Sequence, residues 1–364
     1  MYHNERMQAK ERLLALFDGD ARRRLDRVPT FVQAVNPDFI ERNEDALFSD
    51  DGFDYTNNPW VDAALVLGFD GIFGDFPSAF THEPVEVVGS DGKRHSINTE
   101  GREYHEGTRF YKGGLLTSQE ILDEIRATIK PVTDTRAMQA TIDRGESVAS
   151  RIFLVPKTGG IFSRVLLAMG YKEFAVHYRK NSRFYREMIR FRADLLRMEI
   201  EYLVAGGGKK AGALFIADDI AYKGRPMIPP ERFISDFGKH YKEILGIARD
   251  AGIIPLLHTD GDVTDMVPAF QEVGFRGVQG WEGGCDARVI NERFADFAVI
   301  GFGDMNEVLP FGTGARIEAH VKDLMDALKA NRHFAIGPSS VVNATMPIGN
   351  VRAFVRHARI LGRY

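Results

Sequence analysis

The chain has 364 residues, 44% of them hydrophobic, and a formal net charge of −4. This length and composition allow a large apolar core, and the absence of long basic runs argues against nucleic-acid binding. The single cysteine, Cys285, excludes an internal disulfide and any zinc site with two thiolates from this chain. It fits a reducing cytoplasm. With no apparent signal peptide and no apolar run of ~18 residues, we expect a cytoplasmic protein without a membrane span.

Short apolar strands alternate with helices along most of the chain. After an amphipathic helix over residues 5–18, the pattern predicts strands at 28–35, 69–76, 151–155, 213–217, 253–258, 277–280, 297–301 and 334–336. Helices are expected at 62–68, 118–130, 161–169, 171–178, 182–205, 230–251, 263–273, 286–294, 315–330 and 350–360. About eight such units predict an α/β fold, a (β/α)8 TIM barrel formed by one domain over residues 1–364.

An open, doubly wound sheet is the alternative to a barrel. No glycine-rich dinucleotide loop follows an early strand, which argues against it. The glycines at 206–208 come after a long helix and before a strand, so we expect them to end that helix. Residues 83–98 break the pattern: two β-like runs flank Ser90-Asp91-Gly92, which predicts an inserted β-hairpin.

In a TIM barrel the segments that follow the strands form one face, and catalysis occurs there. The candidate site residues are therefore the polar residues that directly follow each predicted strand. Those expected to bind substrate are Asn36, Asp75, Asp219, Tyr222, Trp281, Asp304 and Ser339, and Gln33 and Ser340 lie in the same segments. Loops are polar in general, so each of these residues alone is weak evidence.

The segment from Leu257 to Asp262 carries the strongest signal. His258 ends an apolar strand, so its imidazole should face the barrel mouth, where it could bind a metal or transfer a proton. Asp260 could orient it, bind the same metal or accept a proton. The alternative is a buried core histidine followed by a simple Asp-Gly turn.

Three further residues are candidates for chemistry. Side chains of adjacent residues diverge at a strand end, so only one of Asp218 and Asp219 should face the pocket. We expect Asp218 to act as an acid, and a helix cap or surface turn is the alternative. Glu282 is a candidate catalytic carboxylate and, with His258 and Asp260, a candidate metal ligand. Cys285 could help to hold zinc or be a bystander thiol.

Several motifs, in this order, resemble the uroporphyrinogen decarboxylase superfamily. Residues 10–17 followed by Leu-Asp-Arg-Val-Pro at 25–29 resemble its N-terminal helix and first strand. The pair Asp218-Asp219 with Pro-Pro-Glu-Arg-Phe at 229–233 resembles a second element. His-Thr-Asp-Gly-Asp at 258–262, Gly-Phe-Gly-Asp at 301–304, and residues 336–340 with 347–351 resemble three later ones. The resemblance covers nearly the whole chain and implies a barrel enzyme.

The superfamily contains porphyrinogen decarboxylases and methyltransferases that work with corrinoid proteins. The decarboxylases carry arginines after the first strand, and this chain has Phe-Val-Gln-Ala-Val-Asn-Pro at 31–37 instead. The inserted hairpin at 83–98 resembles that of the methyltransferases. Their thiol-activating members bind zinc through a His-x-Cys pair and a later cysteine. Here Asp260 and Ser339 or Ser340 stand at the cysteine positions, and this departure suits an oxygen-rich metal site or none.

The resemblance to this methyltransferase branch implies transfer of a methyl group between a small methyl ether or methylamine and cobalamin carried by a partner protein. Zinc is a candidate metal. A decarboxylase or lyase of a small carboxylic acid, using Asp75 or Asp218, is the alternative. A third hypothesis is a barrel that has lost catalysis and serves as a binding subunit. The sequence leaves the oligomeric state open, a homodimer included.

Overall fold

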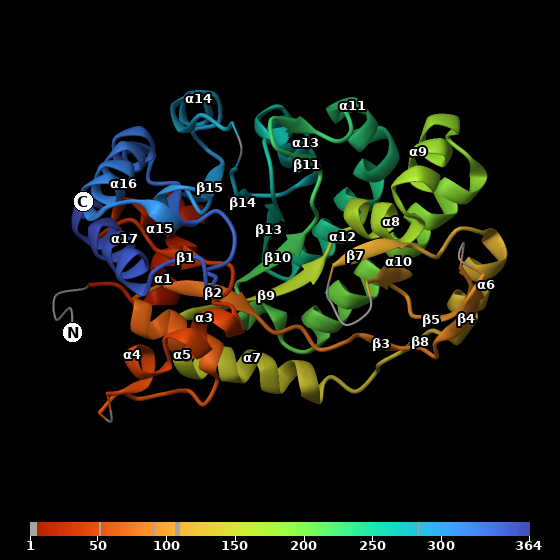
Figure 1. Ribbon diagram of the computed structural model, residues 1–364, viewed down its shortest axis with the longest axis horizontal. Coiled ribbons are helices and arrows are strands. Elements are labelled where there is room, and N and C mark those ends of the chain that lie inside the picture. Colours follow the sequence, from red (N-terminus) through yellow and green to blue (C-terminus); the bar gives the residue numbers. More distant parts are fainter. Residues whose placement is uncertain (1–5, 51, 90–91, 106–109, 283) are drawn as a thin grey trace.

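The computed structural model describes residues 6–50, 52–89, 92–105, 110–282 and 284–364 (Figure 1). Its main sheet contains eight parallel strands in the order β1-β2-β9-β10-β13-β14-β15-β16. Parallel bridges join Thr30 to Ile336 and Val35 to Val342, so the first and last strands also lie side by side. The predicted (β/α)8 TIM barrel is therefore confirmed. The barrel strands are β1 Phe31–Val32, β2 Gly71–Gly74, β9 Phe153–Gly159, β10 Ala213–Ala217, β13 Ile254–Thr259, β14 Gly277–Gly280, β15 Ala298–Gly303 and β16 Phe334–Pro338.

Helices surround this barrel and connect its strands (Figure 1). Before β9 they are α1 Ala9–Leu14, α2 Gly19–Arg23, α3 Pro37–Arg42, α4 Glu44–Phe48, α5 Pro59–Leu67, α6 Gln119–Thr128 and α7 Arg136–Val148. After β9 they are α8 Phe162–Met169, α9 Tyr171–Lys180, α10 Arg183–Ala205, α11 Pro230–Phe233, α12 Lys239–Asp250, α13 Val267–Val273, α14 Ala287–Arg293, α15 Val308–Phe311, α16 Gly314–Leu328 and α17 Ile348–Leu361.

Two predicted elements differ from the structure near the N-terminus. Within the expected helix at 5–18 the structure has α1 and a short 3-10 turn at Ala15–Phe17, and α2 lies beyond it, because the Asp18 side chain accepts hydrogen bonds from the backbone of Asp20 and Ala21 and starts a new helix at Gly19. The expected strand at 28–35 pairs as a strand only at Phe31–Val32. The helix before Gly206 ends at Ala205, as predicted.

The apolar core has an inner and an outer part. Alternate strand residues such as Phe31, Phe215 and Leu256 form a cluster inside the barrel, together with Leu13 and Leu16 of the N-terminal segment. The other strand faces pack against the surrounding helices in a larger cluster. This alternation is expected of a barrel whose interior is filled with side chains, so the open space lies above the strand ends.

A buried ion-pair network lies at the opposite end of the barrel. Asp70 accepts hydrogen bonds from Arg12 Nη1 at 2.8 Å and from Arg27 Nη1 and Nη2 at 2.6 and 2.7 Å. Its carboxylate also accepts from the backbone nitrogen of Thr30 at 2.7 Å. Arg12 in turn pairs with Asp26 at 2.8 Å. The charged residues at 26 and 27 therefore tie the N-terminal segment to the start of β2.

The predicted hairpin is present as β4 (Val85–Val88) paired antiparallel with β5 (Arg94–Ile97), while Ser90 and Asp91 of its turn lie outside the described residues. The same insertion adds β6 (Arg102–Tyr104) with β7 (Tyr111–Gly114), and β3 (Phe80–Thr81) with β8 (Lys130–Pro131). Figure 1 shows these strands beside α6 and α8, at the end of the molecule away from both termini. Among the described helices, none combines the length and apolar character needed to cross a bilayer.

Candidate active site

The carboxyl ends of β10 and β13 bring three predicted site residues together. His258 lies on β13, with only 4% of its surface exposed. Its Nε2 atom lies 4.0 Å from Asp219 Oδ1 and 3.8 Å from Asp260 Oδ1. The three ligand atoms lie within 4.8 Å of one another, close enough for one metal ion. His258 is therefore part of a polar cluster, and not a core histidine among apolar side chains.

Gln279 on β14 fixes the orientation of the His258 ring. The Gln279 amide nitrogen donates to the carbonyl oxygens of Ser339 at 2.9 Å and Pro338 at 3.4 Å. Its oxygen therefore faces His258 Nδ1 at 2.5 Å, and Nδ1 must carry the proton. Burial lowers the pKa of His258 and so favours the neutral ring. This effect outweighs that of the negative charge of Asp219, which raises the pKa. The Nε2 lone pair is thus directed toward the two aspartates, as a metal ligand or proton acceptor requires.

The turn after His258 depends on a glycine. Gly261 has a φ of +88°, and a Cβ at this position would lie 2.7 Å from the carbonyl oxygen of Tyr222. Any other residue would be strained and would push the turn away from the segment after β10. Gly261 therefore keeps Asp260 and Asp219 close, and the Asp260 backbone nitrogen donates to Asp219 Oδ1 at 3.3 Å.

Negative charge is crowded at this point. Burial, Asp219 and Glu282 together raise the pKa of Asp260 to about 7. Asp260 Oδ1 is buried and has no hydrogen-bond partner among the described residues. A cation bound between these carboxylates would relieve the repulsion and satisfy that oxygen. The histidine and carboxylate oxygens suit zinc and other divalent ions.

A pocket of about 760 Å³ opens on the Asp260 side of the cluster, and we call it the Asp260-side pocket. Glu282 lies in it and accepts a hydrogen bond from Ser339 Oγ at 2.9 Å. Trp281 stacks on Phe302 with the ring centroids 5.7 Å apart, and both residues have a positive φ. Of the predicted residues, those that line this pocket are Tyr222, Asp260, Trp281, Glu282, Cys285, Asp304 and Ser339.

Asp218 does not reach the cluster, so we remove it from the catalytic set. Its buried carboxylate accepts hydrogen bonds from the backbone of Phe162 at 3.0 Å and Ser163 at 2.6 Å, and from the Tyr241 hydroxyl at 2.5 Å. The carboxylate therefore caps the N-terminus of α8. One member of the Asp218–Asp219 pair does face the site, as expected, but it is Asp219.

Three other predicted residues have lesser positions. The Cys285 thiol contacts Asp262 Oδ1 at 3.5 Å, and burial and Asp262 raise its pKa to about 12. It is therefore protonated at neutral pH and is a poor zinc ligand. Asn36 occupies the cap position before α3 without a side-chain cap hydrogen bond. Asp304 accepts from the backbone of Asn306 and Glu307, so its carboxylate stabilises a turn at the pocket edge.

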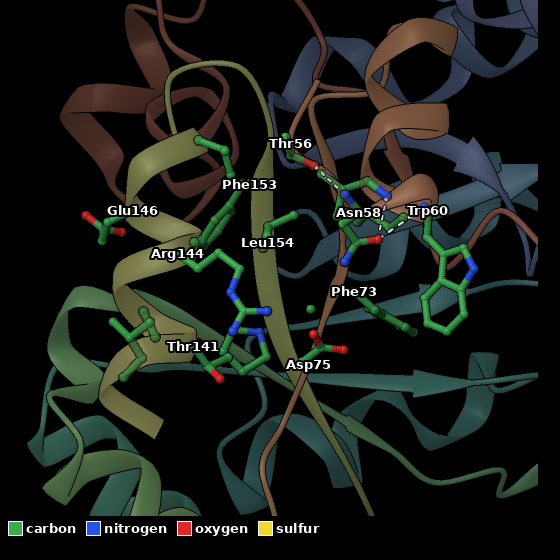
Figure 2. A pocket seen from close by; sticks show the side chains of 18 of the residues that line it. Thr56, Asn58, Trp60, Phe73, Asp75, Thr141, Arg144, Glu146, Phe153 and Leu154 are labelled. Atoms are coloured by element: carbon green, nitrogen blue, oxygen red, sulfur yellow. Dashed lines mark hydrogen bonds between the residues drawn. The ribbon is translucent and has the colours of Figure 1, made fainter. Parts of the chain in front are cut away.

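A separate, more enclosed pocket of about 200 Å³ lies between α5, α7 and the strands β2 and β9. Figure 2 shows Arg144 of α7 and Asp75, which follows β2, extending into it, opposite Trp60 of α5 and Asn58, which caps α5. Gln33 and Asp75 line it, but most of its lining comes from α5, α7 and the lengths of β2 and β9. Since TIM-barrel chemistry occurs at the strand ends, we assign no catalysis to it.

Comparison with known proteins identifies the family. The model of the family described as "Uroporphyrinogen decarboxylase (URO-D)" matches residues 122–360, which is more than half of the chain. The chain belongs to the uroporphyrinogen decarboxylase family. No curated protein sequence gives a match. The matched span includes β9 to β16 of this URO-D family member. It therefore contains the whole cluster of Asp219, His258 and Asp260.

Solved structures support the fold. A methyltransferase from Methanosarcina mazei is 17% identical, with 97% of this chain and 98% of that chain covered and a TM-score of 0.62. A 2,3-dimethylmalate lyase (11% identity, 57% and 61% covered, TM-score 0.29) and a pneumococcal exo-β-D-N-acetylglucosaminidase (10% identity, 96% and 85% covered, TM-score 0.42) are too dissimilar to carry an argument.

Sequence reasoning missed two residues of the site. Gln279 was treated only as part of a short strand, although a fully buried amide in an apolar strand is a signal for a hydrogen-bonding role. Lys157, on β9, lies close enough to Asp219 and His258 to affect the electrostatics of the site. Gln33, which the sequence placed near the site, extends its amide nitrogen to His258 Nε2 at 3.3 Å.

Proposed function

We propose that this URO-D family protein is a corrinoid-linked methyltransferase, which moves a methyl group between a small methylated substrate and cobalamin carried by a partner protein. The observation that carries the proposal is the convergence of His258, Asp219 and Asp260 beside an open pocket at the carboxyl ends of the strands. The fold shared with a protein named as a methyltransferase over nearly its full length adds support.

The chemical difficulty of demethylation is the leaving group. When a methyl group leaves an ether or amine, the oxygen or nitrogen leaves badly unless it is protonated or bound to a metal. His258, Asp219 and Asp260 would hold a divalent ion such as zinc, which when bound supplies Lewis acidity toward that atom. Gln279 keeps the His258 lone pair directed into the site, and the hydrogen bond to Ser339 keeps Glu282 in the pocket.

Gln33 is the residue whose contact a bound metal would replace. Its amide nitrogen lies 3.3 Å from His258 Nε2, and its oxygen accepts from Ser340 Oγ at 2.8 Å. If a metal replaced the contact with His258 Nε2, the hydrogen bond from Ser340 would still hold the Gln33 amide at the edge of the site. The segment directly after β1, residues 33–37, contains no arginine, so it provides no guanidinium for the carboxylates of a porphyrinogen.

Replacing Gln279 with leucine should weaken metal binding. His258 Nδ1–H would lose its acceptor, so the ring would no longer be held in one tautomer and orientation. We expect a loss of zinc affinity of about 10- to 100-fold, measured by competition with a chromogenic chelator. An unchanged affinity would show that Gln279 does not orient a metal ligand. Gln271→Leu, on the surface of α13, is the matched control.

The functional test is an incubation with a reduced corrinoid protein and a panel of methyl ethers and methylamines. We expect methyl-cobalt absorbance to appear with at least one of them. Failure across the broad panel would count against the proposal. Release of carbon dioxide from a small acid without a corrinoid would favour the lyase alternative, although Asp75 and Asp218 lie outside the His258 cluster.

A further inference from the structure

A second pocket, of about 750 Å³, opens on the opposite side of the cluster, and we call it the Asp219-side pocket. Asp219 lines it, so it is continuous with the candidate metal ligands. Its floor is the carboxyl end of β9, and its walls come from the inserted segment around β3 and β6 and from the start of α8. The inserted segment therefore adds a chamber that the barrel strands alone would not form.

Positive charge exceeds negative charge around this chamber. Arg164 pairs with Glu199 at 3.2 Å and with Glu100 at 3.4 Å, and Arg102 pairs with Glu100 at 3.0 Å. Two carboxylates, Glu100 and Glu199, are thus shared among three lining cations, Lys157, Arg102 and Arg164, and the buried Arg192 lies behind them beside Glu100. The third lining carboxylate, Asp219, belongs to the candidate metal cluster; without it the lining cations outnumber the carboxylates by one, and Arg192 adds a further buried positive charge.

The cations also carry hydrogen-bond donors that no described residue accepts. Arg192 is 1% exposed and donates from Nη2 to the Glu100 carbonyl oxygen, but its Nε and Nη1 atoms have no partner among the described residues. The same holds for Arg102 Nε and for His82 Nδ1. Buried donors without acceptors are costly, and their concentration here indicates that an acceptor is missing.

Lys157 links this chamber to the reaction centre. Its ammonium lies 5.9 Å from the centre of the Phe73 ring, and no ion pair or hydrogen bond joins it to another described residue. Its charge acts on both Asp219 and His258. An anionic group in the chamber would therefore lie between Lys157 and the arginines, while the rest of the same molecule extends past Asp219 toward His258.

We propose that the methylated substrate carries an anionic group, a carboxylate, sulfonate or phosphate, which the Asp219-side pocket binds through Lys157 and Arg102, with the buried charge of Arg192 behind them. The proposal rests on the function proposed above and narrows it. It favours methyl ethers of small acids over methylammonium compounds, because a cation in this pocket would face the excess positive charge. Oxyanions match guanidinium donors in both charge and geometry.

Calorimetric binding of a matched pair of probes, 3-methoxybenzoate and its neutral isostere 3-methoxybenzamide, tests the proposal at constant ionic strength. We expect the benzoate to bind about tenfold or more tightly than the amide. Arg102→Gln and Lys157→Gln should each remove most of that preference without changing amide binding. Arg225→Gln, at an exposed arginine that contacts Tyr222 and does not line the Asp219-side pocket, should leave the preference intact. The analogues in which a sulfonate or a phosphonate replaces the carboxylate of 3-methoxybenzoate identify which anion fits best.

Equal binding of the benzoate and the amide would overturn the proposal, as would an equal loss for both ligands in the Arg102 and Lys157 variants. Neither outcome depends on a corrinoid protein, so this test is separate from that of the proposed function. Methyl transfer from a neutral or cationic donor, with no preference for anions, would support the function and contradict the inference. A preference for anions without methyl transfer would support the inference and contradict the proposed function.

Discussion

Replacing His258 with alanine is expected to lower the rate of methyl transfer by at least about a hundredfold. The imidazole is the one nitrogen ligand of the cluster, and both aspartates lie within 4.0 Å of its Nε2 atom. Without it, two neighbouring carboxylates would hold a metal weakly, and no other described group could replace the lone pair. The measurement is the initial rate of methyl-cobalt formation together with the zinc content of the variant.

Because His258 is buried, a second variant separates catalysis from folding. The Asp219 side chain is 53% exposed, so Asp219→Asn should leave the free energy of unfolding within about 0.5 kcal/mol of wild type. We nevertheless expect a loss of activity of tenfold or more. Asp250→Asn, at an exposed position at the end of α12, is the control for removal of a surface charge. Full activity in both the His258 and Asp219 variants would refute the assigned centre.

Replacing Asp70 with asparagine is expected to have the largest effect on stability. The change would leave Arg12 and Arg27, which are 1% and 3% exposed, without their shared carboxylate. Uncompensated buried charge costs about 3–5 kcal/mol, measured by urea denaturation. Asp134→Asn is the matched control, since the Asp134–Arg136 pair is exposed and should contribute little. Similar losses for the two variants would show that the buried network adds no special stability.

The same network predicts a pH dependence. Burial raises the pKa of Asp70, but Arg27 and Arg12 outweigh it and hold the pKa well below its usual range. A carboxyl group with a depressed pKa in the folded state stabilises the protein fully above its unfolded value, near pH 4. That contribution is lost as the pH falls toward the folded pKa. Measured by urea denaturation, the wild type should therefore lose stability as the pH falls below 4. Asp70→Asn lacks this contribution at every pH and should not show that loss.

Much of the architecture could be predicted because the barrel depends on local patterns. Short apolar strands separated by amphipathic helices were enough to predict the eight units, and Asp-Gly was enough to predict the inserted hairpin. The first predicted strand was longer than β1. The ends of a strand are set by its pairing with a neighbour, here β2, whereas the prediction relied on apolar character. The division between α1 and α2 depends on one capping carboxylate, Asp18, whose role a periodic pattern does not reveal.

The site was harder to predict, because its members meet through tertiary contacts. Strand-end logic correctly placed His258, Asp260 and Glu282 near one another. It could not determine which aspartate of the pair at 218 and 219 turns inward, since that depends on the backbone of α8 and the Tyr241 hydroxyl. It also could not identify the contact between Gln279 and His258, because the two residues come from different strands.

A crystal structure with a bound methylated substrate would test the account most directly. We expect the methyl-bearing atom within about 3.5 Å of the group formed by His258, Asp219 and Asp260, or of a metal held there. Density for the substrate in the enclosed pocket between α5 and α7, with the His258 cluster untouched, would contradict it.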